Sequence, residues 1–228
     1  MIIRTSRGHM FTIIISAYNE GENLARLLKR MPTQIPKKNI LVVDDGSSDN
    51  THEIAESLGV QVVKHEVNRG KGAAIRTGLD AAKTDTVVLM DGDNQHDPAE
   101  ADKLLEALES NDMVIGSRFL QKNEMPVHRN IANMLLSAIT CMRGPCITDP
   151  ISGYRALRKG KFKGLKETGF NLELELLYNA RLHNLRIAEV PITVPFIRKK
   201  GSVLNSLPRA IRIYGSMTLY SLKRALLG

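Results

Sequence analysis

Apolar runs rich in β-branched residues alternate with amphipathic segments through the first half of the chain. FTIIISAY at 11–18 predicts a strand, and the segment after it repeats leucine and methionine at the spacing of one helix face. The same order recurs, with predicted strands at 39–45, 60–66, 85–91 and 112–118 and predicted helices at 47–59, 73–82 and 98–110. Strands that are apolar on both faces and alternate with helices predict an α/β fold, with a mostly parallel central sheet covered by helices on both faces.

Polar residues mark the ends of these predicted elements. One of the three polar residues at 47–49 can cap the second helix, which Gly59 ends. Asp97 can cap the helix that starts at Pro98, a residue suited to a first helical position. The strands are expected to leave the sheet at a common carboxyl edge, where ligands of such sheets bind.

The second half contains two amphipathic stretches, at 125–144 and 206–226, in which aliphatic residues are interleaved with arginine and lysine. Helices of this kind can lie in a bilayer interface, or they can pack on the domain. We expect one domain over 10–228 with these two C-terminal amphipathic helices. Residues 1–9 end in Gly8-His9 and resemble the scar of a cloning site, so they are a possible tag or disordered leader.

The chain has 228 residues, a net charge of +8 and two cysteines. The positive charge favours an anionic partner, which could be nucleic acid, a phospholipid surface or a phosphorylated substrate. Nucleic acid is the least favoured of these, because the chain has no tryptophan and no nucleic-acid module. Cys141 and Cys146 predict neither a zinc site nor a disulfide framework. A cytoplasmic protein, peripheral on the cytoplasmic face of a membrane, fits these features.

An acidic cluster, DGDNQHDP, follows the fourth predicted strand. Asp91 and Asp93 are two positions apart, so their carboxylates can converge on one hard cation, with Gln95 and His96 within reach. Oxygen ligands of this type suit Mg²⁺ or Mn²⁺, which share their remaining positions with substrate phosphates. Without a cation the two carboxylates would repel each other, so we expect a metal and a diphosphate ligand here.

Two further segments carry candidate chemistry. Asp44, at the end of the second predicted strand, can accept hydrogen bonds from a nucleobase or a ribose, although VVDDGSSDNT is also an ordinary turn sequence. NRGKG at 68–72 lacks the spacing of a nucleoside-triphosphate P-loop, but Arg69 or Lys71 could face a phosphate at the start of the next helix.

Taken in order, SAYNEGENL, VVDDGSSDNT, NRGKGAAIRTG, DGDNQHDP, GSR and TDPISGYR resemble the motifs of the family-2 inverting glycosyltransferases with a GT-A fold. Within that family the resemblance is to the polyprenyl-phosphate branch. It covers 11–221, nearly the whole chain. Two positions depart from the family pattern: Ser16 replaces a proline, and Val203 follows Ser202 where the branch usually has lysine.

The resemblance implies a role for each matching residue. It gives a catalytic role to Asp91, Asp93 and Asp149 and a metal site formed by Asp91, Asp93 and Gln95. The residues implied for the nucleotide sugar are Ala17, Tyr18, Glu20, Asp44, Lys71, Gly92, Ser152 and Gly153. The residues implied for the acceptor phosphate are Arg118, Arg198, Lys199, Lys200 and Ser202.

The expected reaction moves a hexose from GDP-mannose or UDP-glucose to a polyprenyl or dolichyl phosphate, at a membrane surface and with a possible separate membrane-anchor protein. A phosphate nucleophile is already an anion and needs no general base. A sugar-hydroxyl acceptor would need one, and Asp149, Asp93 or His96 would be the candidate. Two alternatives remain: a nucleotidyltransferase, and a non-catalytic membrane-associated protein that binds nucleotide sugars.

Overall fold

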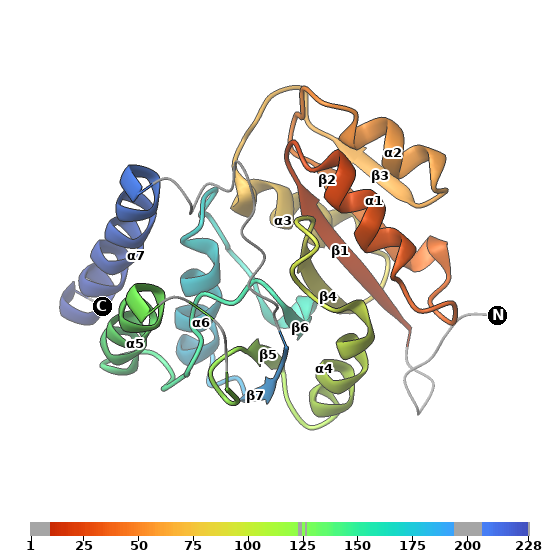
Figure 1. Cartoon of the computed structure of the whole chain (residues 1–228). Helices are drawn as coiled ribbons and strands as arrows, with labels where there is room; N and C mark the ends of the chain where they lie inside the picture. The colour runs from red at the N-terminus through yellow and green to blue at the C-terminus, as the bar shows by residue number, and fades with distance from the viewer. Residues whose placement is uncertain (1–9, 123–124, 126, 194–206, 228) are drawn as a thin grey trace.

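A mixed β-sheet separates two layers of helices (Figure 1). The computed structural model describes residues 10–122, 125, 127–193 and 207–227. The strands are β1 (Phe11–Ala17), β2 (Ile40–Asp44), β3 (Gln61–Lys64), β4 (Thr86–Asp91), β5 (Met113–Ser117), β6 (Arg155–Arg158) and β7 (Ile187–Pro191). The helices are α1 (Gly21–Lys29), α2 (Thr51–Ser57), α3 (Lys71–Ala81), α4 (Ala101–Leu108), α5 (Val127–Cys141), α6 (Leu172–Leu182) and α7 (Leu207–Leu227), with 3₁₀ turns at Lys37–Asn39, Pro98–Glu100 and Lys159–Lys161.

The sheet has seven strands in the order β3-β2-β1-β4-β6-β5-β7. Strands β1 to β4 pair in parallel, β5 pairs in parallel with β7, and β6 runs antiparallel between β4 and β5. The predicted α/β class and mostly parallel sheet are confirmed. The sequence analysis missed β6, β7 and α6, because the segment after 118 lacks the long apolar runs of the first half.

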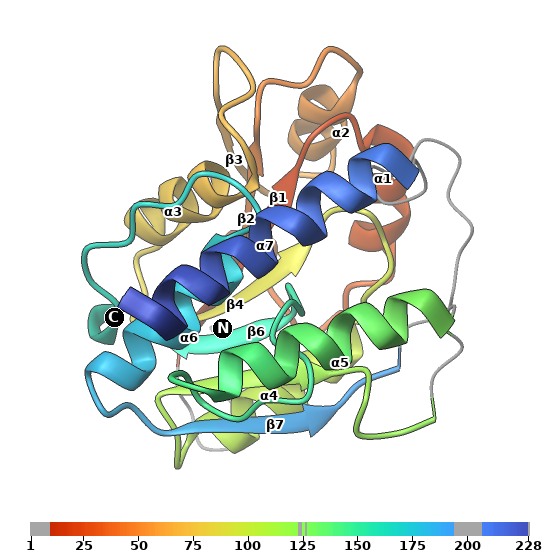
Figure 2. The same ribbon diagram turned by 90° about the vertical axis from the view of Figure 1, so that its left-hand side faces the viewer.

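Successive residues of β1 pack into two separate parts of the hydrophobic core, one on each side of the sheet. Ile14 packs on the side covered by α3, α5, α6 and α7, whereas Ile13 and Ile15 pack on the side covered by α1, α2 and α4. Figure 2 shows α5 and α7 on the outside of the helix layer that also contains α3 and α6. Helices α5 and α7 contact each other. Successive strand residues point to opposite faces, so a strand covered on both sides must be apolar throughout.

The helix starts agree only in part with the capping residues predicted from the sequence. Asp97 caps the turn at Pro98 as predicted, because its side chain accepts the N–H of Ala99 at 3.1 Å. That segment starts as a 3₁₀ turn before it becomes α4. The residue at the start of α2 is Asn50, with no side-chain cap bond, and Asp49 instead accepts the N–H of Thr51 at 3.0 Å.

Candidate active site

Two aspartates flank the carboxyl end of β1. In the strand register Ala17 lies opposite Asp44 of β2, and Ser16 lies opposite Asp91 of β4. The exits of β1 and β4 approach closely, since the N–H of Gly92 donates to the carbonyl of Ser16 at 2.9 Å and a side chain at Gly92 would lie 3.0 Å from the Ala17 methyl. The strand topology thus brings together the acidic residues that the sequence placed at separate strand ends.

Asp44 is fully buried, and one of its oxygens has no protein partner. Oδ1 accepts the N–H of Ser47 at 2.9 Å, whereas Oδ2 is buried without a hydrogen bond in the part of the chain that the structure describes. Neighbouring Asp45 is fully engaged, because it accepts from His65 Nδ1 at 2.7 Å and from the backbone N–H groups of Arg69 and Gly70. Buried polar atoms normally have partners, so Asp44 Oδ2 is the oxygen to which a ligand donor fits.

The other residues expected near the nucleoside follow β1. Ala17 is buried, and its carbonyl accepts the N–H of Asp45 at 2.9 Å. Tyr18 is exposed, so its ring is accessible to a ligand. Glu20 accepts from the Asn23 side chain at 2.8 Å, which orients its carboxylate at the start of α1. These three residues lie at or after the end of β1, which pairs with the strand that ends at Asp44. Their binding of the nucleotide sugar stays a prediction.

The strand ends at Asp44 and Asp91 form what we call the acidic edge of the sheet. Lys71 begins α3, and its ammonium group lies at this edge. Its Nζ lies 2.8 Å from Asp91 Oδ1 and 2.7 Å from Oε1 of Glu173 on α6. Burial by itself lowers the pKa of Lys71, but the carboxylates of Asp91 and Glu173 outweigh that effect and raise it well above its usual value. The expectation that Asp91 is uncompensated without a metal is therefore wrong, because Lys71 is already its counter-ion.

Glycines flanking Lys71 allow this approach. Gly70 has a φ of +96°, and a Cβ there would lie 2.4 Å from the carbonyl oxygen of Thr168. A Cβ at Gly72 would lie 2.7 Å from the carbonyl oxygen of Glu167. The start of α3 can pack against 167–169 only because both positions lack a side chain, and this contact brings Lys71 to α6. The glycines of NRGKG thus serve helix packing rather than a P-loop.

Asp93 and Gln95 lie in the turn after β4. Asn94 adopts a left-handed φ of 61°, and Asp93 Oδ1 accepts the N–H of Gln95 at 3.1 Å. Among the described residues, no three side chains of the His, Cys, Asp and Glu types form a metal cluster. Two carboxylates and an amide oxygen still fit Mg²⁺ or Mn²⁺, since such ions need few protein ligands when phosphates complete their shell.

His96 is buried beside this turn. Its Nε2 lies 3.7 Å from Asp91 Oδ2, and its ring packs against Tyr154 with centroids 4.8 Å apart. The Tyr154 hydroxyl in turn donates to the carbonyl of Asp97 at 2.9 Å. This packing fixes the turn against the loop that carries Gly153.

Arg118 and Asp149 form a bidentate ion pair. Arg118 Nε lies 2.7 Å from Oδ2 and Nη2 lies 2.7 Å from Oδ1 of Asp149, which has no exposed surface. Burial lowers the pKa of Arg118, but the Asp149 carboxylate outweighs that effect and raises it. Arg118 was expected to bind the acceptor phosphate. Its Nε and Nη2 are instead committed to Asp149, so that role stays a prediction.

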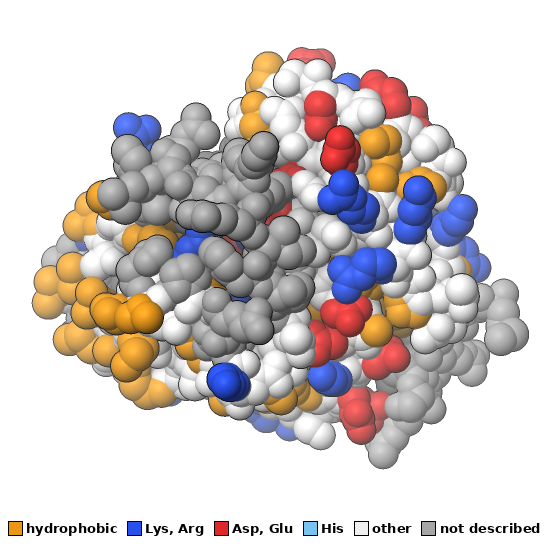
Figure 3. All heavy atoms as spheres, viewed as in Figure 1, with side chains coloured by type: hydrophobic (Ala, Val, Ile, Leu, Met, Phe, Trp, Pro, Cys, Tyr) orange, Lys and Arg blue, Asp and Glu red, His pale blue; other side chains and the backbone are white. Residues whose placement is uncertain are grey.

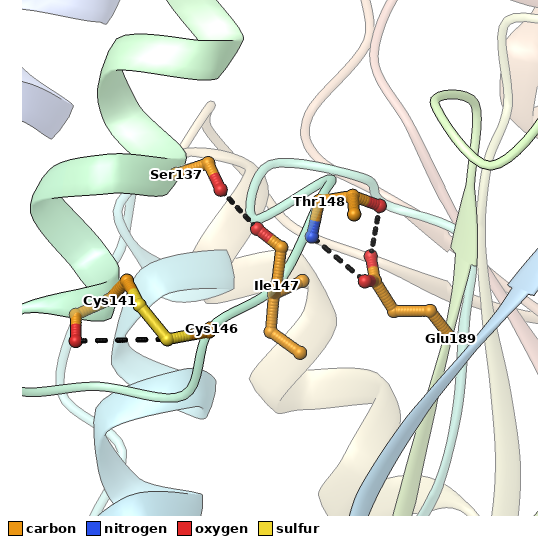
Figure 4. Close-up of a disulfide and its surroundings, with 6 residues drawn as sticks. All are labelled: Ser137, Cys141, Cys146, Ile147, Thr148 and Glu189. Carbon is orange, nitrogen blue, oxygen red and sulfur yellow. Dashed lines mark hydrogen bonds between the residues drawn. A yellow bond between two sulfur atoms is a disulfide. The ribbon is translucent and has the colours of Figure 1, made fainter.

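The loop that carries Asp149 is held on two sides (Figure 4). Glu189 of β7 accepts the N–H and the hydroxyl of Thr148, each at 2.8 Å, and Ser137 of α5 donates to the carbonyl of Ile147. Cys141 and Cys146 form a disulfide between the end of α5 and this loop. The expectation of no disulfide is therefore wrong: the chain turns back directly after α5 and brings the two Cα atoms to 4.3 Å.

Ser152 and Gly153 complete the loop. The Ser152 hydroxyl is buried and donates to the carbonyl of Gly116 at 2.6 Å, so it has a structural role. A Cβ at Gly153 would lie 2.6 Å from Asp91 Oδ2 and 2.9 Å from Lys71 Nζ. Gly153 therefore lies directly against Asp91 and Lys71, and its contact with the nucleotide sugar stays a prediction. Arg198, Lys199, Lys200 and Ser202 lie outside the described residues.

Sequence reasoning missed three charged residues that build this site. Glu173 holds Lys71, Glu189 holds the Asp149 loop, and Arg155 is fully buried. Arg155 donates to the carbonyls of Pro150, Ser152 and Glu173, all at 2.7 Å, and burial lowers its pKa to about 10. Glu173 and Glu189 lie outside the motifs, and Arg155 ends TDPISGYR, for which no role of this arginine was implied. In the structure Glu173 and Arg155 are recognised by their burial, and Glu189 by its hydrogen bonds to the loop.

Exposed aliphatic side chains cover the outer face of α5 and α7. We call this the α5–α7 apolar surface; it consists of Val127, Ile131, Met134, Leu135, Ile211, Leu219, Leu222 and Leu226. Figure 3 shows hydrophobic side chains gathered over these helices. Within the described residues, none of the helices has the length and apolarity to cross a membrane. Helix α5 contacts the Asp149 loop through its inward face, because buried Asn133 donates to the carbonyl of Thr148 at 2.7 Å.

The chain is similar in sequence to several known proteins. The sequence profile described as glycosyl transferase family 2 matches residues 12–165. An uncharacterised protein of Methanocaldococcus jannaschii is 38% identical in an alignment of 193 positions, which covers 79% of this chain and 79% of that protein. A dolichol-phosphate mannosyltransferase of Pyrococcus furiosus is 34% identical over 83% of this chain and 57% of its own length. An undecaprenyl-phosphate mannosyltransferase of Micrococcus luteus is 33% identical over 79% of this chain and 81% of its own length.

The fold is also found among solved structures. The crystal structure of glucosyl-3-phosphoglycerate synthase from Mycobacterium tuberculosis superposes with a TM-score of 0.77 at 24% identity, over 96% of this chain and 80% of that one. A likeness at this identity gives the fold alone, and it confirms the GT-A architecture expected from the sequence.

Proposed function

The chain belongs to glycosyl transferase family 2 and is a glycosyltransferase, and from this premise we propose that it moves a hexose from a nucleotide diphosphate sugar to a polyprenyl phosphate, with inversion. GDP-mannose and UDP-glucose are the donors we propose first. The relatives from Pyrococcus furiosus and Micrococcus luteus carry names that state a polyprenyl-phosphate acceptor, which supports the same acceptor class here.

The observation that carries the proposal is that α5 connects the loop bordering the acidic edge with an exposed apolar surface. Asp44 offers a buried, unpartnered oxygen to a nucleoside, and Asp93 lies at the neighbouring strand exit. The Asp149 loop that borders this edge is bonded to α5, whose outer face is apolar. A donor with a nucleoside and a diphosphate fits the first feature, and a lipid-linked acceptor fits the second.

A phosphate acceptor agrees with the engagement of Asp149. A sugar hydroxyl would need a general base, but both oxygens of Asp149 accept hydrogen bonds from Arg118 in a buried pair. A polyprenyl phosphate brings its own negative charge, so positioning and charge neutralisation suffice. The basic residues at 198–200 remain the proposed phosphate ligands.

The metal fits the same scheme. Asp93, Gln95 and Asp91 would hold Mg²⁺ or Mn²⁺, and the ion when bound would neutralise the departing nucleoside diphosphate. Asp91 keeps Lys71 as its counter-ion, which holds the carboxylate in place at the end of β4. Asp44 orients the nucleoside through its unpartnered oxygen.

We further propose that the α5–α7 apolar surface lies on the cytoplasmic face of a membrane. Its aliphatic side chains are bordered by exposed Arg143, Arg212 and Lys223, a pattern that suits an anionic bilayer interface. Flotation with vesicles of phosphatidylcholine and phosphatidylglycerol tests this. Ile131→Ser should reduce the bound fraction several-fold, whereas Met10→Ser, which alters an exposed apolar residue before β1, should not. If Ile131→Ser and Met10→Ser bound the vesicles equally well, the α5–α7 apolar surface would not be the membrane-binding surface.

Transfer is tested with labelled donors, Mn²⁺ and detergent-dispersed polyprenyl phosphate. We expect label in an organic-extractable lipid product, and none with Asp93→Asn. Label found only in soluble sugars would favour a hydroxyl acceptor instead. Donor binding without turnover would favour a nucleotide-sugar-binding protein. In a separate reaction, release of pyrophosphate from a nucleoside triphosphate and a sugar phosphate would favour a nucleotidyltransferase.

A further inference from the structure

Lys71 lies between two carboxylates, that of Asp91 at the end of β4 and that of buried Glu173 on α6. Nζ is 2.8 Å from Asp91 Oδ1 and 2.7 Å from Glu173 Oε1, and the Glu173 side chain is 3% exposed. Glu173 Oε2 is buried and has no hydrogen-bond partner within the described ranges. A buried carboxylate with so few partners is costly unless its charge has a use.

The surroundings hold this trio in one arrangement. Gly153 leaves no room beside Lys71 Nζ, since even a methyl group there would lie 2.9 Å away. Arg155 donates to the carbonyl of Glu173 and to that of Ser152, so it ties the start of α6 to the loop next to Gly153. Lys71 therefore cannot leave Asp91 easily, and its position is set by Glu173.

Two carboxylates and one ammonium leave a net charge of about −1 at the end of β4. If Glu173 lost its charge, Lys71 would neutralise Asp91 alone, and the site would attract a cation less. If Lys71 lost its charge, the site would become more negative and would attract a cation more. The two members of the ion pair thus act on cation binding in opposite directions.

We propose that Glu173 is a positioning residue, which holds Lys71 against Asp91 and thereby sets how strongly the Asp91–Asp93 site attracts a divalent cation. This inference rests on the proposed function, because it concerns the cation that would accompany the donor diphosphate. It adds a residue that no motif in the sequence indicates.

The test measures Mn²⁺ binding without nucleotide or acceptor, by electron paramagnetic resonance of free Mn²⁺. Glu173→Gln should weaken binding roughly 10- to 100-fold, the range seen when residues behind metal ligands are changed. Lys71→Met should tighten binding, and the double variant should return close to wild type. A purely structural role of Glu173 would not produce opposite shifts in the two single variants.

Glu175→Gln is the matched control. Glu175 is also buried in the first turn of α6, but its hydrogen bonds within the described part of the chain come from the backbone N–H groups of Lys166 and Glu167. We expect this variant to bind Mn²⁺ like wild type even if its melting temperature falls. If Lys71→Met does not fold, the inference is tested by comparing Mn²⁺ binding of Glu173→Gln and Glu175→Gln. Weaker binding by Glu173→Gln alone supports it, and equal binding by the two variants overturns it.

Three results would overturn the inference: Glu173→Gln binding Mn²⁺ as tightly as wild type, Lys71→Met binding it more weakly, or no Mn²⁺ binding by wild type even with GDP or UDP present. These results are separate from a failure of the proposed function. Transfer to a different acceptor would refute the proposed acceptor and leave the order of Mn²⁺ affinities unchanged.

Discussion

Replacing Asp149 by asparagine tests whether its carboxylate is structural or reactive. Asp149→Asn removes one charge and one acceptor from a pair in which Arg118 donates through Nε and Nη2, both at 2.7 Å. The guanidinium would remain largely buried without a counter-charge, and breaking such a pair costs about 3 to 5 kcal/mol. For a domain of this size we expect the melting temperature to fall by about 10 °C.

The chain has no tryptophan, so unfolding is best followed by circular dichroism in urea and on heating. Glu22→Gln is the control, because it breaks the exposed pair between Glu22 and Arg26 and should leave the melting temperature unchanged. An Arg118→Met variant and the double variant complete a double-mutant cycle, which isolates the pair energy. A variant Asp149→Asn that melts like wild type but has lost all transfer would refute the structural role and favour a general base.

Three other perturbations follow from the described contacts. Replacing both Cys141 and Cys146 by serine should lower the free energy of unfolding by about 2 kcal/mol, because the short disulfide loop is lost. Reductant should lower the melting temperature of wild type and not that of this variant. A wild-type melting temperature that reductant does not change would contradict the prediction. Gly153→Ala places a methyl group 2.6 Å from Asp91 Oδ2, so we expect a loss of about 1 to 3 kcal/mol and at least about tenfold weaker transfer; unchanged kinetics would show that the loop moves freely. Burial raises the pKa of Asp49, but hydrogen bonds from Thr51 outweigh it and lower the pKa below 3.8, so its stabilisation is present above that pH and is lost as the pH falls through the lowered pKa. The difference in urea midpoint between wild type and Asp49→Asn should therefore be largest near neutral pH and shrink as acid is added, and a constant difference would contradict it.

The parallel half of the sheet could be predicted because its signal is local. Strands β1, β2, β4 and β5 are apolar runs, β3 has two valines between Gln61 and Lys64, and amphipathic helices lie between the strands. The placement of Asp44 and Asp91 at one edge follows from that topology, since parallel strands share their carboxyl ends. The residues that approach the site from 145–193 carry no such signal.

Strand β6 illustrates why the rest could not be predicted. Its residues Arg155–Arg158 begin and end with arginine, a composition typical of an exposed segment. Arg155 is nevertheless fully buried, because three backbone carbonyls from a loop and from α6 accept its N–H groups. Such compensation depends on contacts between distant segments. The partnership of Lys71 with Glu173 and the disulfide after α5 have the same origin.

The carboxylates of the site differ in whether a protein group already pairs with them, and this difference predicts the order in which nucleotide and metal bind. Asp91 and Asp149 each have a basic partner inside the protein, whereas Asp44 keeps one buried oxygen without a partner among the described residues. A nucleoside that donates to Asp44 would remove an existing cost, and it needs no ion pair to be broken. A divalent cation gains less at Asp91, because Lys71 already neutralises part of its charge. We therefore expect a nucleotide to bind measurably without metal, and the metal, which binds alone, to bind more tightly once the diphosphate has added its own negative oxygens.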